Sequence, residues 1–109
     1  MGIPTIGSLL VIKFPYADMR TFKKRPVIVV AMSSLNTMVV CQITSKNNEN
    51  LPAVPLQHTD FLSGSLAISS FVRPDKLFTI DRVGKYQVLG QISENKLKKI
   101  KQQIIKIFD

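Results

Sequence analysis

The feature of this sequence that most constrains its fold is a change in the spacing of its apolar residues near residue 93. Before that point the apolar residues fall in short runs, rich in β-branched side chains and separated by prolines or polar turns. Such runs are typical of strands. They cover residues 8–14, 26–32, 36–44, 51–56, 65–72, 76–81 and 86–92. We therefore expect the chain up to residue 92 to fold mainly as β-sheet.

After Ser93 the apolar residues recur at the spacing of an amphipathic helix. They are Leu97, Ile100, Ile104, Ile107 and Phe108. Ser93 is placed to cap this helix, and Glu94 suits its positive end. The solvated face is expected to consist of the lysines between the apolar positions, Lys96, Lys98, Lys99, Lys101 and Lys106. Short strands closed by one helix, in a chain of 109 residues, predict a small twisted barrel or half-barrel in one domain, residues 1–109.

Two neighbouring runs predict a hairpin. The stretch SSLN between 26–32 and 36–44 is turn-like. The second run alternates, so its side chains divide between two faces. Val39, Cys41 and Ile43 are expected on one face, and Val40, Gln42 and Thr44 on the other.

Prolines set limits on the later strands. Two of them fall within 51–56, which confines that run to an edge or an irregular strand. Pro74 lies between 65–72 and 76–81 and is expected to separate two strands.

The chain has the character of a cytoplasmic protein without a membrane span. No run approaches the 18 or so apolar residues of a transmembrane helix. The N-terminus lacks the early charges and the cleavage site of a signal peptide. Cys41 is the one cysteine and stands in an apolar run, so we interpret it as a buried thiol in a reducing compartment.

The charge of the chain favours polyanionic partners. Fifteen Lys and Arg against seven Asp and Glu give a formal net charge of +8. Solubility alone is the competing explanation for this charge. The position of one basic cluster favours a phosphate-binding site over solubility alone. This cluster stands at the start of an apolar strand and consists of Arg20, Lys23, Lys24 and Arg25.

The residue types and motifs that the chain lacks exclude several kinds of catalytic site. The chain has one histidine, His58, which excludes a two-histidine ribonuclease mechanism within one chain. It has no cysteine cluster, glycine-rich phosphate loop or GxSxG motif. We expect no metal and no cofactor, so an enzyme of this sequence must use arginine, hydroxyl groups and a few carboxylates.

Three short stretches supply such groups near strand ends. KKRP contains Arg25, whose planar fork of donors fits a phosphate. QITSK contains Thr44, with Ser45 and Lys46 after it. VRPDK contains Arg73 and Asp75, for which a surface ion pair is the plain alternative.

In this order and at this spacing the motifs resemble the PemK/MazF family of type II toxin–antitoxin ribonucleases. The resemblance runs nearly end to end, through GSLLVIKFPYAD, KKRPVIVV, VCQITSK, SSFVRPDKLFTID and LGQIS. It implies an SH3-like barrel with a C-terminal helix, acting as a homodimer. It also implies metal-independent cleavage of single-stranded RNA or mRNA at specific sequences, and an acidic antitoxin that occupies the RNA groove.

The same resemblance assigns residues. Arg25 and Thr44 fall on catalytic positions of the family, and the Arg73–Asp75 pair falls on positions implicated in some members. We expect the RNA 2′-hydroxyl to attack the adjacent phosphate, with Arg25 and Arg73 stabilising the developing charge and Thr44 holding the phosphate. Asp75 either orients Arg73 or takes the proton. RNA phosphates are expected to contact Lys23, Lys24, Ser45 and Lys46.

Two departures from the family concern the N-terminal part. The chain has Gly7-Ser8 where the family usually has Gly-Asp, and residues 15–24 lack the glycine usual in this loop. Neither change removes a group that the chemistry needs.

Three alternatives stay open at this point. A non-catalytic nucleic-acid-binding barrel needs the basic cluster but not Thr44 and Asp75. A gyrase poison of the CcdB type needs an apolar, aromatic tip on its terminal helix. The only aromatic residue of this chain there is Phe108. A family member that has lost its activity is the third.

Overall fold

The protein is described here by a computed structural model of residues 4–15, 22–46, 52–66, 68–84 and 86–109, with residues 14, 15, 22 and 23 described by their backbone alone. Within these ranges the elements are β1 (Ser8–Pro15), β2 (Phe22–Met32), β3 (Thr37–Thr44), β4 (Val54–Leu56), the 3₁₀ turn η1 (His58–Asp60), β5 (Phe61–Gly64), β6 (Ser70–Asp81), β7 (Gln87–Ile92) and α1 (Glu94–Ile107). The described strands form one seven-stranded sheet in the order β4-β6-β3-β2-β1-β7-β5.

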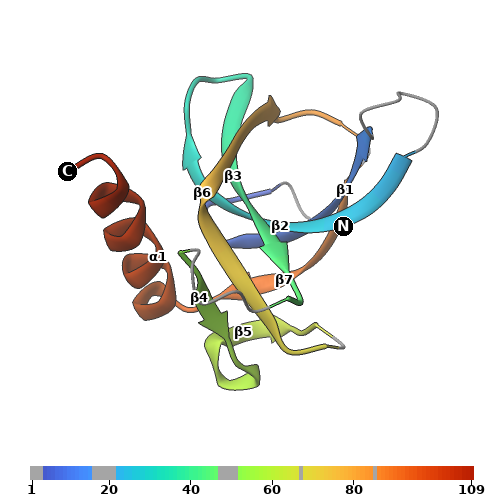
Figure 1. Ribbon diagram of the computed structural model, residues 1–109. Helices are drawn as coiled ribbons and strands as arrows, with labels where there is room; N and C mark the ends of the chain where they lie inside the picture. The colour runs from blue at the N-terminus through green and yellow to red at the C-terminus, as the bar shows by residue number, and fades with distance from the viewer. Residues whose placement is uncertain (1–3, 16–21, 47–51, 67, 85) are drawn as a thin grey trace.

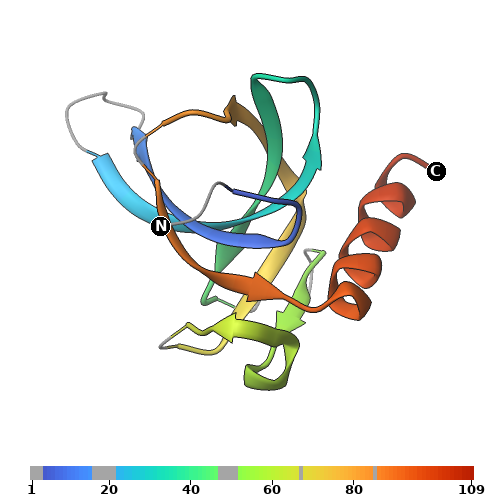
Figure 2. The ribbon, with the colours of Figure 1, turned by 180° about the vertical axis from the view of Figure 1, so that it is seen from behind.

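The sheet curls into a half-barrel, and α1 lies along one side of it (Figures 1 and 2). Every strand pair is antiparallel. The expected hairpin is present, since β2 pairs with β3 across the turn at residues 33–36. The proline-containing strand β4 is at an edge, as predicted. The prediction of a mainly β fold with a C-terminal helix is confirmed.

Apolar side chains cover both faces of the central strands. One face, which we call the helix-side face, packs against Ile100 of α1 through a buried cluster that includes Leu9, Cys41 and Val72. The opposite face, which we call the far face, has its own buried cluster, Leu10, Ile12, Val27, Val29, Met38 and Val40. The alternation predicted for residues 36–44 is therefore confirmed, because Cys41 and Val40 belong to opposite clusters.

Helix α1 begins as the sequence predicts. The hydroxyl oxygen of Ser93 accepts a hydrogen bond from the backbone N–H of Lys96 at 3.2 Å. Ile100 is fully buried, and burial of such a side chain contributes about 1.5–3 kcal/mol. Ile107 and Phe108 are exposed, so the apolar stripe packs only along the first part of the helix. Among the described residues, no helix combines the length and the apolar character that a bilayer crossing requires.

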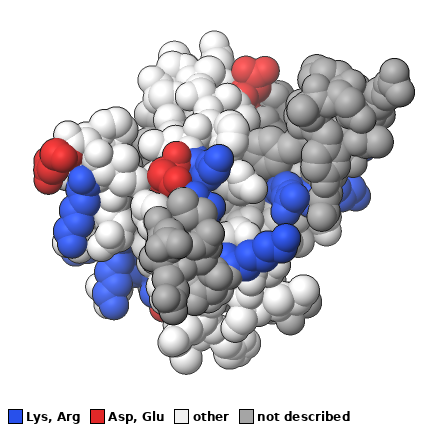
Figure 3. All heavy atoms as spheres, in the orientation of Figure 1, with Lys and Arg blue, Asp and Glu red and all other residues white. Residues whose placement is uncertain are grey.

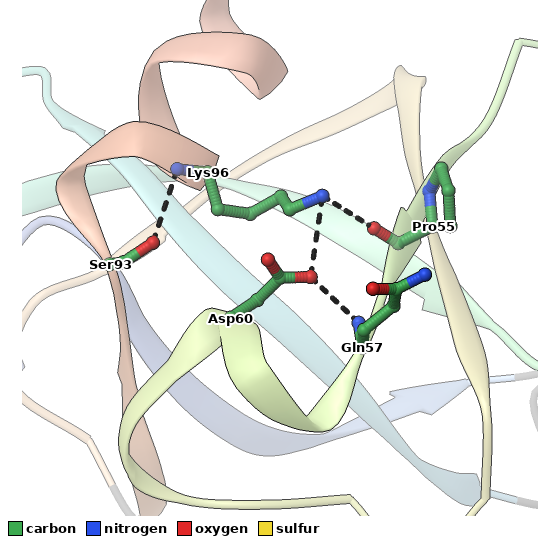
Figure 4. A network of polar contacts seen from close by, with 5 residues as sticks. All are labelled: Pro55, Gln57, Asp60, Ser93 and Lys96. Carbon is green, nitrogen blue, oxygen red and sulfur yellow. Dashed lines mark hydrogen bonds and ion pairs between the residues drawn. The ribbon is translucent and has the colours of Figure 1, made fainter.

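The prediction that Lys96 belongs to the solvated face is wrong, because its side chain lies inward between α1 and η1 (Figure 4). Its ammonium Nζ donates to the carbonyl oxygen of Pro55 at 3.0 Å and lies 3.3 Å from Oδ2 of Asp60. The same Oδ2 accepts from the backbone N–H of Gln57 at 2.7 Å. This network joins α1 to the β4–η1 connection. The remaining four lysines of α1 are not buried in this way: Lys98, Lys99, Lys101 and Lys106 are exposed, as predicted.

The prediction of two strands separated at Pro74 is also wrong. One strand, β6, runs through Pro74, and the described residues before it, 65, 66, 68 and 69, have no strand structure. The proline is tolerated because it lies in a bulge, where the register of β6 against β3 shifts between Cys41 and Gln42 and no ladder hydrogen bond is required of it. Strand β5 is a further element that the sequence did not indicate, and β2 begins four residues earlier than predicted, at Phe22 instead of 26.

Candidate active site

Arg25 and Thr44 come from adjacent strands and face the same way. Arg25 is opposite Ile12 of β1, a far-face residue, and lies two positions before Val27. Thr44 lies two positions after Gln42, the partner of Val27 in the β2–β3 ladder. Paired residues of antiparallel strands point to one face, and every second residue returns to it. Arg25 and Thr44 are therefore neighbours on the far face, where its apolar cluster ends.

Arg73 reaches the same place from the other side of β3. It pairs with Gln42, and Phe71 pairs with Thr44. Adjacent strands are about 4.8 Å apart, so the backbones of β2 and β6 flank β3 at about 10 Å from each other. Two long guanidinium side chains can approach one ligand across that width. Arg25, Thr44 and Arg73 are each half-buried. We call these three residues the site group.

Asp75 holds Arg73 in a forked ion pair. Nε of Arg73 donates to Oδ1 of Asp75 at 3.0 Å, and a terminal guanidinium nitrogen donates to Oδ2 at 2.7 Å. The hydrogen bonds from Arg73 are the main reason that the pKa of Asp75 lies below its usual value. The fork uses two of the five N–H donors of the guanidinium, which leaves three for a ligand. A carboxylate held in this way is a weaker proton acceptor than a free one.

Thr44 is oriented by the turn that follows it. Its hydroxyl oxygen accepts a hydrogen bond from the backbone N–H of Lys46 at 3.2 Å. A hydroxyl that accepts in this way keeps its own hydrogen as a donor. The arrangement suits an anionic oxygen above the far face, because Thr44 then offers one donor between two guanidiniums.

The four residues predicted to contact phosphates do not all lie on the face of the site group. Ser45 and Lys46 are exposed directly after Thr44. Lys24 is exposed, but alternation puts it on the face opposite to Arg25, beside Lys13 with which it pairs. The side chain of Lys23 lies outside the described residues, as does Arg20 of the same basic cluster. Basic side chains are spread over both α1 and the sheet on the side of the molecule shown in Figure 3.

The cysteine and the histidine of the chain do not belong to the site group, since Cys41 packs on the helix-side face and His58 lies in η1. Burial raises the pKa of the Cys41 thiol to about 12, which confirms it as an inert core residue. His58 is exposed in η1. Among the described residues, no group of three or more His, Cys, Asp and Glu side chains lies close enough together to hold a metal ion.

Two residues of this face were not among the predicted site residues. Gln42 lies between Val27 and Arg73 in the ladders, and Phe71 lies opposite Thr44. The alternation in residues 36–44 already placed Gln42 on the face of Thr44, so the sequence contained the information for it. Phe71 requires the register of β6, which the sequence does not supply.

Comparison with known proteins gives one fold and one family. No curated protein matches the chain in sequence. A MazF structure from Deinococcus radiodurans is similar to it with a TM-score of 0.70 and 19% identity, over 99% of this chain and 98% of that one. A MazE-MazF structure from the same organism gives a TM-score of 0.71 and 19% identity, over 99% and 97%. An endoribonuclease from a mycobacterial species gives 0.67 and 16%, over 99% and 93%.

At these identities the structural likenesses establish the fold. The family follows from the sequence itself, because residues 6–108 match the model of the PemK-like, MazF-like toxins of type II toxin–antitoxin systems. That match includes every residue of the site group and both partners of the fork. The chain therefore belongs to the PemK/MazF toxin family.

Proposed function

We propose that this protein is the toxin of a type II toxin–antitoxin pair and acts as an endoribonuclease that cuts single-stranded RNA or mRNA at specific sequences. The observation that supports the proposal most directly is the shared face of Arg25, Thr44 and Arg73, three residues far apart in the chain. Membership of the toxin family and the solved relative described as an endoribonuclease support the same activity.

The reaction is transesterification within the RNA. The 2′-oxygen forms a bond to the adjacent phosphorus, and the bond from phosphorus to the 5′-oxygen breaks. The products are a 2′,3′-cyclic phosphate and a 5′-hydroxyl. The proton of the 2′-hydroxyl passes to solvent, and the departing 5′-oxygen takes a proton from water. Because the substrate supplies its own nucleophile, the chain has to bind the phosphate in line and stabilise charge on its non-bridging oxygens.

The site group divides these tasks. Arg25 and Arg73 donate to the non-bridging oxygens from either side of β3, and Thr44 donates its hydroxyl hydrogen between them. Asp75 keeps Arg73 in position, a role that its lowered pKa favours over proton abstraction. Lys23, Ser45 and Lys46 hold the phosphates on either side of the cleaved one, whereas Lys24, on the opposite face of β2, takes no part in this contact. None of these roles requires a metal ion or a cofactor.

The partners follow from charge and family. A net charge of +8 suits both an RNA backbone and an acidic antitoxin segment that competes for the same face. The relatives solved as MazE-MazF support an antitoxin partner. We propose further that residues 1–109 act as one domain in the cytoplasm and that the toxin is a homodimer. Light scattering coupled to size exclusion gives its mass in solution, and a monomer at micromolar concentration contradicts the dimer.

The activity is tested by incubating the purified protein with a long single-stranded RNA in EDTA and mapping the new 5′ ends. We expect cuts at a repeated short sequence, each leaving a 5′-hydroxyl. Arg25→Ala is expected to slow cleavage by about 10²–10³-fold, the usual cost of losing one such donor. Lys101→Ala removes a positive charge from the exposed side of α1 and is the matched control.

Three results would contradict the proposal. Intact RNA that the protein nevertheless retains indicates a binding module instead of an enzyme. Cleavage that appears only with added Mg²⁺ contradicts the metal-independent mechanism. Cleavage that persists in Arg25→Ala assigns the activity to other residues or to a contaminant.

A further inference from the structure

We propose that Gln42 and Phe71 form a nucleobase subsite beside the cleaved phosphate, in which the Gln42 amide reads the edge of one base of single-stranded RNA. This inference rests on the proposed endoribonuclease function and names the part of the same face that selects the sequence.

Gln42 occupies the centre of the far face at the site. It is the partner of Val27 on one side and of Arg73 on the other, and Thr44 follows it on the same face. Side chains directly opposite one another have Cβ atoms about 4.5–5.5 Å apart, so the amide lies within reach of anything bound between the two arginines. Gln42 is half-buried, as are Arg25, Thr44 and Arg73 around it.

The amide of Gln42 has no hydrogen-bond partner among the described residues. Its ladder partner Val27 is apolar and fully buried, and so is Val40, two positions before it on the same face. Its other ladder partner, Arg73, has only donors and already directs two of them to Asp75. Among the described residues, the Gln42 amide therefore keeps both a donor and an acceptor for a ligand.

Phe71 supplies the second half of the subsite. It pairs with Thr44, so it stands diagonally from Gln42 on the same face, at about 7–8 Å. Its ring is half-buried, and on the outer side the residue pairs with Pro55 of β4. Aromatic side chains stack with any nucleobase, whereas an amide discriminates among bases through the donors and acceptors on their edges. A base stacked on Phe71 presents its edge toward Gln42.

This geometry favours a base over a second phosphate as the occupant. In the proposed function, the guanidiniums of Arg25 and Arg73 bind the anionic oxygens, and a neutral amide adds little attraction for a charge. Gln42 and Phe71 are each neighbours of both Thr44 and Arg73, so a base that they hold belongs to a nucleotide next to the reacting phosphate. The subsite therefore lies beside the reacting phosphate, so the base that it accepts determines which bond is cut.

The test compares the wild-type protein with Gln42→Leu, which keeps a similar volume and removes the amide. The substrates are a pool of RNAs randomised around a cleavage site, and the 5′ ends are mapped by sequencing. We expect preference at one nucleotide position next to the cut to fall by about tenfold to hundredfold, with preferences elsewhere unchanged. Gln102→Leu, an exposed glutamine on α1, is the matched control and should keep the wild-type preference.

A second measurement does not depend on catalysis. Oligonucleotides with a 2′-deoxy residue at the cleaved position bind without being cut, and their affinities are measured with each of the four bases beside it. Gln42→Leu should bind all four about equally. Phe71→Leu should weaken binding of all four while preserving their order. If Gln42→Leu melts far below the wild type, Gln42→Glu replaces it; its carboxylate only accepts hydrogen bonds, so preference should move to guanine, which offers two donors on one edge.

The outcomes separate this inference from the proposed function. Wild-type cleavage with an unchanged preference profile in folded Gln42 variants overturns the base-reading role and leaves the nuclease in place. A wild-type protein that neither cuts RNA nor discriminates among the oligonucleotides overturns both.

Discussion

Replacing Asp75 by asparagine tests whether this carboxylate orients Arg73 or abstracts the proton of the 2′-hydroxyl. The Asp75→Asn variant keeps the shape of the side chain and one acceptor oxygen, but it loses the negative charge and one of the two fork bonds. Those bonds measure 3.0 and 2.7 Å and join side chains that are 14% and 28% exposed. The two roles predict losses of different size.

The size of the orienting effect follows from the fork. A hydrogen bond to a charged group contributes about 1.5–3 kcal/mol when it is buried. The Arg73–Asp75 pair is partly solvated, and the amide of the variant retains one weaker bond, so we assign about 1–2 kcal/mol to the change. If all of this is lost in the transition state, kcat/KM falls by about 5- to 30-fold. Removal of a general base costs about 10²–10⁴-fold instead.

The assay is single-turnover cleavage of an RNA with one site, followed between pH 5 and 8. Arg73 lowers the pKa of Asp75, so the carboxylate is ionised throughout this range and an orienting role predicts no change in the shape of the pH profile. Asp81→Asn, at the end of the same strand, is the control for loss of one acidic charge. A loss above 10²-fold, or a pH profile that changes shape, refutes the orienting role.

Three further predictions concern the fold. Lys96→Ala loses the bonds to Pro55 and Asp60 and should lower the free energy of unfolding by about 2 kcal/mol, which lowers the melting temperature by about 8–16 °C. The control Lys98→Ala, at an exposed position, should change the free energy of unfolding by less than about 0.5 kcal/mol. Because burial raises the pKa of Cys41 to about 12, a thiol reagent at pH 8 should leave it unmodified until denaturant is added. Gly64→Ala should cost about 1–3 kcal/mol or prevent folding, because Gly64 has φ +70° and an added Cβ would clash with the carbonyl oxygen of Leu89; a melting temperature near that of the wild type would contradict this.

Local patterns predicted the elements that depend on local causes. The helix starts at the serine that caps it, the hairpin forms at its turn, and the strand with two prolines lies at an edge, where missing donors are tolerated. Lys96 was misplaced because a lysine at a polar position of a helix is usually solvated. Its burial depends on η1 packing against α1, a contact between segments about 40 residues apart. Strand β5 has only four residues and no alternating pattern.

The shared face of the candidate residues was predictable in part for the same reason. Resemblance to the family nominated these residues, and alternation along residues 36–44 gives the face of Thr44. Nothing in one strand says which residues of another lie opposite it, so the neighbourhood of Arg25 and Thr44 depends on the β2–β3 register. The separation of Lys24 from Arg25 follows directly from alternation, and it shows that a run of basic residues in a strand does not form one patch.

Arg73 shows why an irregular strand was the hardest part to anticipate. Leu77 pairs with Cys41 and belongs with the helix-side cluster, and Arg73 is four residues away, an even number. In a regular strand both side chains would point to the helix-side face, and the guanidinium would be turned away from Arg25 and Thr44. The bulge at residues 74–76 changes this parity, since Arg73 pairs with Gln42, the very next residue of β3. Pro74, which suggested a break between two strands, instead marks the bulge that directs Arg73 to the far face and leaves Asp75 free of the ladder to bind it.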